Sequence, residues 1–358
     1  MQNKFDNIPI PERLDEVVIS SMNEIRKIKN RRLRNKVIAA SAATVIAIGG
    51  LGITNPAIAS KLPIISQIFS QVEKKITFSG DYSSLANKVD VETQSSEGLD
   101  ITVAEVYCDG YSAYITLEMN YKDELGKLPR FPLDVDESES HESIYCHIKG
   151  SIDGINEERI IDSFERIEGS KTGPNSFAGV LKVNLDRVPY INDEFSLKLS
   201  LRQVLIESLD KGGIVDAADN PNGYLVSGPL DFNIPITVDK ENVKKIEVNE
   251  ENDLGFGLIS VVVTPFEIIV EDIRPEDLDA IEFGTGVTVF NDKGEAMQYY
   301  GGREAKDGAK GAAVFSVNEK DTSELHIYTG ENFIKTIKQK DENKMKEMAT
   351  YSKTIKVK

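Results

Sequence analysis

The side chains best suited to catalysis or metal binding are scarce in this sequence. It contains three histidines, His141, His147 and His326, two cysteines and no tryptophan. No nucleophilic serine or cysteine motif surrounds the histidines, and no G-x-S-x-G, H-E-x-x-H, P-loop or dinucleotide fingerprint occurs. We therefore expect neither enzymatic activity nor a cofactor.

An acidic run offers the one pattern that could hold a cation. Asp134, Asp136, Glu137 and Glu139 precede His141 in the stretch DVDESESHE, and Ca²⁺ prefers oxygen ligands. The run lacks the regular ligand spacing and the turn glycine of a dedicated calcium loop. We interpret it as a solvated acidic loop and predict no metal.

Charge is distributed unevenly along the chain. The 358 residues carry a net charge of −17, yet residues 1–36 hold nine Lys or Arg against five Asp or Glu. The stretch 37–54 holds no charge, so the acidity lies beyond it. An acidic body lacks the phosphate-neutralising charge that nucleic-acid binding requires. We expect no nucleic-acid partner.

The uncharged stretch Val37–Thr54 is long enough to cross a membrane. As a helix, these residues would span roughly 27 Å, close to the thickness of the hydrocarbon core. Basic residues accumulate on the cytoplasmic side of membrane helices, and none follows the stretch until Lys61. The residues that set this topology are Arg31, Arg32, Arg34 and Lys36. We predict a cytoplasmic N-terminus, one transmembrane helix and a large body outside the cell membrane.

Two other interpretations of the apolar stretch compete with a membrane anchor. A buried core helix could be equally apolar, but four adjacent basic residues would then be a coincidence. A cleaved signal peptide is suggested by Ala57-Ile58-Ala59, an A-x-A pattern at a plausible distance. Pro56 inside that site and the long preceding tail favour an uncleaved anchor. Whether Ala59 is a cleavage site stays open.

The tail, residues 1–36, is predicted to contain an amphipathic helix. Pro11 suits a first helical turn, and acidic residues follow it at the positive end of the helix dipole. An apolar stripe then recurs at spacings of three and four, and it consists mainly of Leu14, Val17, Val18, Met22 and Ile25. So short a tail cannot cover this stripe itself, so the stripe docks on a protein or lies on the membrane surface. Basic residues crowd only the last third of the tail, which favours a protein partner.

Residues 55–75 are predicted to be a juxtamembrane segment with a short helix over Ile64–Ser70, whose apolar residues have helical spacing. From Lys75 onward the hydrophobic period changes to two. Alternating runs on either side of Asp109-Gly110 predict a β-hairpin. Further strands are predicted at Tyr145–Ile148, Ala178–Asn184, Glu194–Leu201, Leu230–Val238, Lys244–Val248, Ile259–Thr264, Phe266–Glu271, Gly286–Phe290, Ala312–Ser316 and Leu325–Tyr328.

Many short strands with frequent turn signals indicate β-sandwiches. Because the body exceeds one sandwich, we divide it near Ser208–Gly228 into domains at 76–210 and 225–358. The predicted fold class is therefore mainly β: an N-terminal amphipathic helix and one transmembrane helix, then two immunoglobulin-like β-sandwich extracellular domains. Cys108 and Cys146 both lie on strand-like runs outside the membrane, where a disulfide is chemically allowed; the spacing leaves open whether it forms.

Several of these segments together resemble the domain of unknown function 4179 family of Gram-positive bacteria. The family carries an "NPAxA…LPxxxxIF" stretch just outside the membrane, matched here within 54–69. Ile101–Glu105 with Asp109-Gly110 is similar to the family's outer domain. Leu230–Asp239 and Ser260–Glu267 resemble an immunoglobulin-like C-terminal domain often found with it, although Leu230-Asp231-Phe232 replaces its common "WxF".

The resemblance implies a function for the tail. Many members of this group look like anti-sigma factors paired with extracytoplasmic-function sigma factors. On that basis the stripe Leu14, Val17, Val18, Met22 and Ile25 would bind the sigma factor. Release would follow an external event acting near 55–75, typically cleavage by a membrane or site-1-type protease. The alternative is a surface-anchored adhesion or wall-binding protein with a passive tail.

Overall fold

A computed structural model describes the chain over residues 68–126, 128, 130–131, 141–153, 161–185, 192–205, 225–275, 286–303, 311–330 and 341–357. The chain divides into two units, 1–63 and 64–358, and every described residue belongs to the second. The predicted tail and membrane segment therefore lie outside the described residues. Within the ranges that the structure covers, no helix has the length and apolarity needed to cross a membrane.

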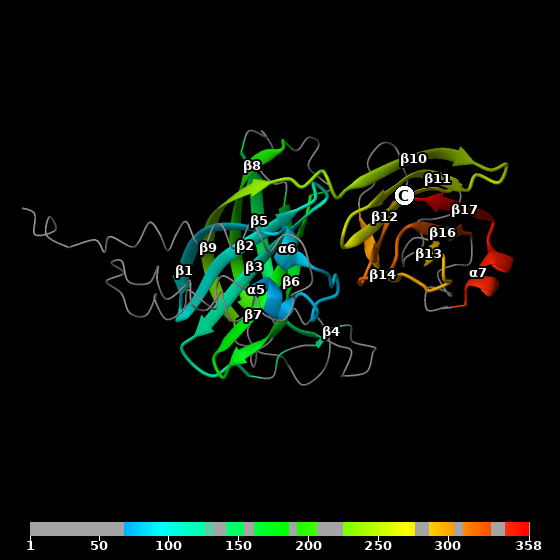
Figure 1. Cartoon of the computed structure of the whole chain (residues 1–358). Helices are drawn as coiled ribbons and strands as arrows, with labels where there is room; N and C mark the ends of the chain where they lie inside the picture. The colour runs from blue at the N-terminus through cyan, green and yellow to red at the C-terminus, as the bar shows by residue number, and fades with distance from the viewer. Residues whose placement is uncertain are drawn as a thin grey trace, which may run out of the picture. The chain divides into compact units, whose positions relative to one another are not determined.

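Strands dominate the described part of the chain, as the period-two pattern predicts (Figure 1). The first strands form one antiparallel sheet in the order β1-β2-β3-β7-β6-β5-β8-β9, with β4 paired to β5. We call it the large sheet. Its strands are β1 (Asn87–Ser96), β2 (Leu99–Cys108), β3 (Ser112–Tyr121), β4 (Arg130–Phe131), β5 (His141–Ile152), β6 (Ile161–Gly173), β7 (Ser176–Asn184), β8 (Glu194–Leu205) and β9 (Leu225–Thr237).

The two edge strands of the large sheet, β1 and β9, are joined by side chains. Ser96 Oγ donates to the carbonyl of Ser227 at 2.7 Å, and the Ser227 amide donates to Glu97 at 3.2 Å. Inward side chains from β2, β3 and β5 to β9 pack into one apolar core. The sheet therefore curls around its own core. This differs from the predicted two-sheet sandwich for residues 76–210, because the apolar face is covered by the same sheet.

The hairpin predicted at Asp109-Gly110 is confirmed. Strands β2 and β3 pair from Leu99↔Tyr121 to Cys108↔Ala113. Asp109 Oδ1 accepts hydrogen bonds from the amides of Tyr111 and Ser112 at 2.8 and 2.7 Å, an Asx turn that aspartate favours. Gly110 has a φ of +82°, which a residue without Cβ adopts at little cost.

The later strands form two sheets that pack face to face. The five-stranded sheet has the order β10-β11-β12-β15-β14, and the three-stranded sheet has the order β13-β16-β17. Apolar side chains from both sheets share one core, as in a β-sandwich. The strands are β10 (Lys244–Glu251), β11 (Gly257–Val263), β12 (Glu267–Ile273), β13 (Val287–Asn291), β14 (Gln298–Arg303), β15 (Gly311–Ser316), β16 (Glu324–Thr329) and β17 (Tyr351–Lys356).

Three short helices complete the described part of the chain. They are α5 (Ile68–Val72), α6 (Tyr82–Leu85) and α7 (Glu342–Met348). Asp341 caps α7 by accepting from the amides of Asn343 and Lys344, and Met345 packs on Phe290 and Tyr328. The helix predicted over Ile64–Ser70 is observed over Ile68–Val72, and residues 64–67 lie outside the described ranges.

The predicted domain boundary needs one correction. Leu230–Val238 was assigned to the second domain, but β9 pairs with β8 along its length, from Glu194↔Thr237 to Leu205↔Leu225. Alternating apolar residues of β9, such as Leu230 and Phe232, fill the core of the large sheet. Strand β9 therefore belongs to the first domain.

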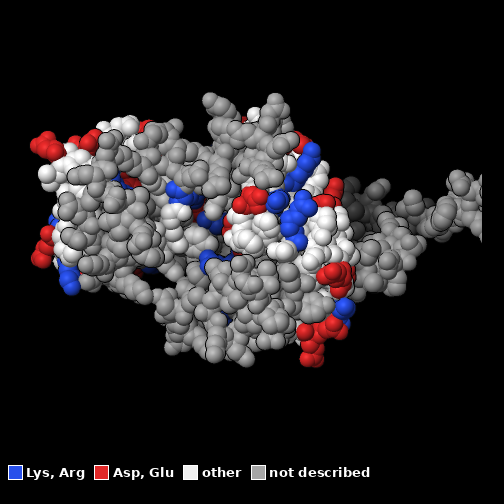
Figure 2. Space-filling view, turned by 180° about the vertical axis from the view of Figure 1, so that it is seen from behind, with Lys and Arg blue, Asp and Glu red and all other residues white. Residues whose placement is uncertain are grey.

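Exposed charges of both signs are mixed on the face seen in Figure 2. Among the described residues, several form exposed ion pairs: Lys198 Nζ lies 2.6 Å from Asp153 and Lys149 Nζ lies 3.3 Å from Asp162. Exposed pairs of this kind contribute little to stability.

Candidate functional site: the strap and the buried Glu267 cluster

The residues that the sequence assigns to sigma-factor binding and to topology lie outside the described residues. These are Leu14, Val17, Val18, Met22 and Ile25 in the stripe, and Arg31, Arg32, Arg34 and Lys36 before the membrane segment. The same is true of Asp134, Asp136, Glu137 and Glu139. The described residues all follow the predicted membrane segment, so the candidate site is sought among them.

The structure shows the surroundings of both cysteines and the contacts of His147 and His326, which the sequence did not specify. Cys108 and Cys146 are buried free thiols in the core of the large sheet, so the disulfide that the sequence allowed is not formed. His147 Nε2 lies 2.7 Å from Asp162, and His326 Nδ1 lies 2.6 Å from Glu342. In the described ranges, no group of three or more His, Cys, Asp or Glu residues could hold a metal ion.

Residues 68–86, which we call the strap, run from α5 to the start of β1 and bury most of their apolar side chains, while most of their polar side chains are exposed. Phe69 and Tyr82 are fully buried, and Ile76 and Phe78 are each 4% exposed. Figure 1 shows α5 and α6 against the large sheet, where α5 contacts β2, β3 and β7. Residues 68–75, the described part of the predicted juxtamembrane segment 55–75, are therefore part of the folded body, and residues 55–67 lie outside the described ranges.

Carboxylates of the large sheet hold the strap by its backbone. Glu105 on β2 accepts a hydrogen bond from the Phe69 amide at 3.1 Å. Glu168 on β6 accepts from the Thr77 amide at 2.6 Å. The first amides of a helix have no partner within it, so Glu105 satisfies a donor that burial would otherwise leave unpaired. Burial raises the pKa of Glu105, although the Phe69 amide acts in the opposite direction.

The five-stranded sheet and the residues beside it hold the other side of the strap. Ser316 Oγ on β15 donates to the Thr77 carbonyl at 2.6 Å. The ring of Tyr82 stacks on that of Phe266, with centroids 3.6 Å apart and planes 11° apart. At Gly80 the backbone approaches so closely that a Cβ would lie 2.5 Å from the Phe266 ring. Thr77 is thus bound by one sheet through its amide and by the other through its carbonyl.

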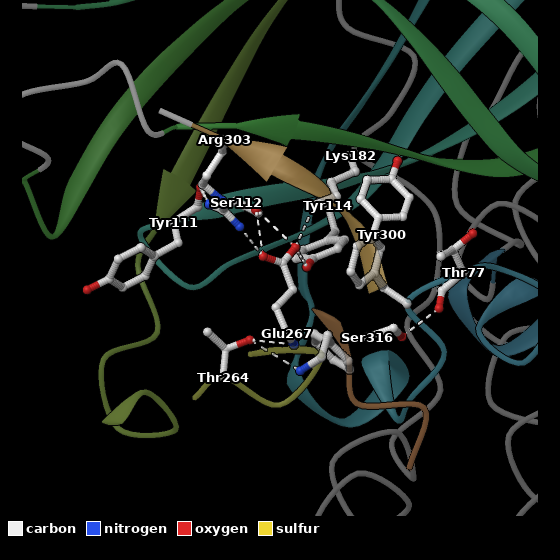
Figure 3. A network of polar contacts seen from close by, with 12 residues as sticks. Thr77, Tyr111, Ser112, Tyr114, Lys182, Thr264, Glu267, Tyr300, Arg303 and Ser316 are labelled. Carbon is white, nitrogen blue, oxygen red and sulfur yellow. Dashed lines mark hydrogen bonds and ion pairs between the residues drawn. The ribbon is translucent and has the colours of Figure 1, made fainter. Parts of the chain in front are cut away.

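A cluster of buried charges lies beside the strap, centred on Glu267 at the start of β12 (Figure 3). The Glu267 carboxylate is fully buried. It accepts hydrogen bonds from Ser112 Oγ at 3.1 Å and from the Tyr114 hydroxyl. It forms ion pairs with Lys182 Nζ at 2.6 Å and with Arg303 Nη2. We call these five residues the Glu267 cluster.

Members of the Glu267 cluster come from strands that are far apart in the sequence. Ser112 and Tyr114 are on β3 and Lys182 is on β7, all in the large sheet. Glu267 and Arg303 begin β12 and end β14 in the five-stranded sheet. The cluster therefore ties the two sheets together with charge-assisted hydrogen bonds, which are stronger than neutral ones.

The electrostatics of the cluster depend on having two cations around one carboxylate. Burial opposes ionisation of Glu267, but the charges of Lys182 and Arg303 and the hydrogen bonds outweigh it and lower its pKa to about 2. Nearby Asp109 behaves oppositely. Burial and the negative charge of Glu267 raise the pKa of Asp109 to about 6. Asp109 Oδ2 has no hydrogen-bond partner among the described residues.

Lys182 links the cluster to the strap. Its ammonium lies 3.9 Å from the centre of the Phe78 ring and 4.9 Å from that of Tyr300, distances typical of cation–π interactions. The Phe78 and Tyr300 rings are themselves 4.5 Å apart. The same ammonium thus binds Glu267 and covers a strap side chain. The sequence analysis did not single out these residues; the signals it held were charged residues inside predicted strands, Lys182 in Ala178–Asn184 and Glu267 in Phe266–Glu271.

Comparisons with known proteins give one family match and a weak structural likeness. Residues 29–120 match the model of a family described as "Domain of unknown function (DUF4179)". No curated protein matches the chain. A crystal structure described as the conserved domain protein from Bacillus anthracis is similar at a TM-score of 0.42 and 14% identity, covering 78% of this chain and 93% of that chain.

Proposed function

Because residues 29–120 match the DUF4179 family, as the sequence resemblance anticipated, we propose that this chain is a membrane-tethered anti-sigma factor. Its tail, residues 1–36, lies in the cytoplasm and binds an extracytoplasmic-function sigma factor. Residues 37–54 cross the cell membrane once. The β-rich body lies outside and senses an external signal.

The proposal rests on one observation: a single family match runs without a break from the tail into the β-rich body. Residues 29–120 contain the basic run, the uncharged stretch, the strap and strands β1 to β3. Basic residues before an apolar stretch retain the N-terminus inside the cell. The body begins only fourteen residues after Thr54, at Ile68 of the buried strap. In a chain of this organisation, one short membrane-spanning segment connects the outer fold to the inner tail.

The tail supplies the binding surface in this proposal. An amphipathic helix without a core of its own binds by laying its apolar face into a partner's groove. Leu14, Val17, Val18, Met22 and Ile25 would cover the sigma factor's polymerase-binding surface. Cleavage outside the membrane, by a membrane or site-1-type protease, would end this inhibition.

A transcription measurement in the native host tests the proposal. The double variant Leu14→Asp and Val18→Asp places two charges in the apolar stripe, so the sigma factor's regulon should be transcribed without an external signal. The matched control, Asn23→Asp and Asn30→Asp, also adds two negative charges. Residues 23 and 30 are about two turns apart on the face of the predicted helix opposite the stripe, so transcription should stay repressed. A passive tail on an adhesion protein instead predicts no transcriptional change in either variant.

A further inference from the structure

The strap is held by two sheets at once, and this division gives it a particular mechanical property. The large sheet supplies Glu105 and Glu168 to strap amides. The five-stranded sheet supplies Ser316, while Phe266 beside it provides the ring on which Tyr82 stacks. If the two sheets separated, the strap would lose the second group of contacts while retaining the first. Its burial therefore depends on the sheets remaining together.

The Glu267 cluster connects those sheets through the ion pair between Lys182 and Glu267, beside which Arg303 forms a second ion pair with the same carboxylate. Lys182 lies 11% exposed and Arg303 4% exposed against a carboxylate with no exposure. Loss of one member of a buried ion pair leaves an uncompensated charge in a poorly solvated site, which is strongly destabilising. Neutralising Glu267 would remove the carboxylate that both cations contact, leaving Asp109 as a further acidic side chain whose charge acts on them. Water entering the site would solvate the remaining charges, and its entry requires the two sheets to part at this point.

The cluster is also in direct contact with the strap. The Lys182 ammonium that pairs with Glu267 lies against the Phe78 ring. Arg303 donates to the Tyr111 carbonyl at 3.3 Å, which connects β14 to the tip of the β2–β3 hairpin. A disturbance at Glu267 therefore reaches the strap through one side chain.

From this geometry we propose that the Glu267 cluster is a lock that keeps the strap buried between the sheets. Opening of the lock releases residues 68–86 while the cores of the large sheet and of the sandwich stay folded. In the anti-sigma function proposed above, on which this regulatory meaning rests, release would expose the chain next to the membrane segment to an external protease. The proposal assigns the regulated step to a defined element of the body.

Hydrogen exchange of the full chain in detergent micelles, read by mass spectrometry at peptide level, tests the lock. Glu267→Gln removes the central charge and preserves the shape of the side chain. The matched control is Glu250→Gln, which removes an exposed carboxylate paired with Lys353 in the same sandwich. We expect exchange of peptides covering residues 68–86 to accelerate at least tenfold in Glu267→Gln. Peptides from β5, β8 and β16 should keep the exchange of the unmodified chain, and Glu250→Gln should change none of them.

Two results would overturn the lock: unchanged exchange in the strap of Glu267→Gln, or an equal acceleration over the whole body. If Glu267→Gln does not fold, Ser316→Ala decides, because it removes the hydroxyl that bonds the Thr77 carbonyl and the Asn318 side chain and leaves the five residues of the Glu267 cluster unchanged. Selective acceleration in residues 68–86 of Ser316→Ala supports the lock, and uniform or absent acceleration contradicts it. Sigma-factor binding plays no part in this readout, so failure of the lock and failure of the anti-sigma proposal are separate results.

Discussion

The Lys182 ammonium and the Glu267 carboxylate lie 2.6 Å apart, although they belong to different sheets and are separated by 85 positions in the sequence. The pair is buried and shares its surroundings with Arg303 and Phe78. Water does not reach this buried pair, so removing either side chain would leave the charge of the other without compensation. The pair thus joins the two sheets at a point that also contacts the strap.

Replacing Lys182 with methionine should destabilise the body measurably. Methionine keeps the length of the side chain and removes its charge, so Glu267 retains only Arg303 as a charged partner. We expect the free energy of unfolding to fall by about 3–5 kcal/mol in denaturant titration. Lys198→Met, which breaks an exposed pair with Asp153, should cost less than about 1 kcal/mol. Equal effects of the two changes would argue against a special role for the buried pair.

A methyl group at Gly80 should disturb the packing of the strap. An added Cβ would lie 2.5 Å from the Phe266 ring, whereas nothing lies within 4 Å of a Cβ added at Gly301. Overpacking of this kind typically costs about 1–3 kcal/mol. Thermal unfolding should therefore show a lower midpoint for Gly80→Ala than for Gly301→Ala. The reverse order would show that the strap is not confined against Phe266.

Stability should depend on pH through Asp109. Its pKa of about 6 in the folded chain exceeds that of an aspartate in an unfolded chain, about 3.9, so folding favours the protonated form. The corresponding stabilisation is fully present below about pH 3.9 and is lost as the pH rises through about 6. The loss for this group amounts to about 3 kcal/mol, because each pKa unit corresponds to about 1.4 kcal/mol.

The variant Asp109→Asn isolates this contribution. Asparagine retains an oxygen that can accept from the amides of Tyr111 and Ser112, but it does not titrate. Denaturant unfolding between pH 4 and pH 7.5 should show a smaller decline in stability for the variant. The same decline in both proteins would assign the pH dependence to other groups.

The two cysteines give a direct chemical check of the core of the large sheet. Burial removes both thiols from water and thereby raises the pKa of each. Neither cysteine forms a disulfide. Thiol reagents should therefore leave the folded chain unmodified at neutral pH and should modify two thiols per chain after denaturation. Intact mass spectrometry under non-reducing conditions measures this, and a mass lower by two hydrogens would indicate a disulfide instead.

Local pattern accounts for the parts of the fold that the sequence predicted well. The Asp109-Gly110 hairpin follows from two alternating runs around a turn pair, and strands such as β7 and β12 follow from short apolar runs between turn residues. Strands β1, β4, β6, β14 and β17 were not predicted. Except for the short β4, their sequences are rich in polar residues, as in NKVDVETQSS of β1, because one of their faces is in contact with solvent or another polar surface.

Pairing between distant segments could not be predicted in the same way. Strand β9 carries a clear strand pattern, but nothing local states that its partner is β8 rather than a strand of the second domain. The Glu267 cluster has the same origin, since its members lie on β3, β7, β12 and β14. A single charged residue in a strand normally faces solvent, and only the assembled sheets place Glu267 in a buried site between two cations.

Capture of a sigma factor by the intact chain tests the central claim most directly. The full-length protein, isolated from native membranes in mild detergent, should retain an extracytoplasmic-function sigma factor that mass spectrometry identifies. The single variant Leu14→Asp should retain at least tenfold less, about 1.4 kcal/mol in binding free energy, while Asn23→Asp should retain as much as the unmodified chain. Absence of any sigma factor from the unmodified chain, or equal retention by Leu14→Asp, would contradict the account.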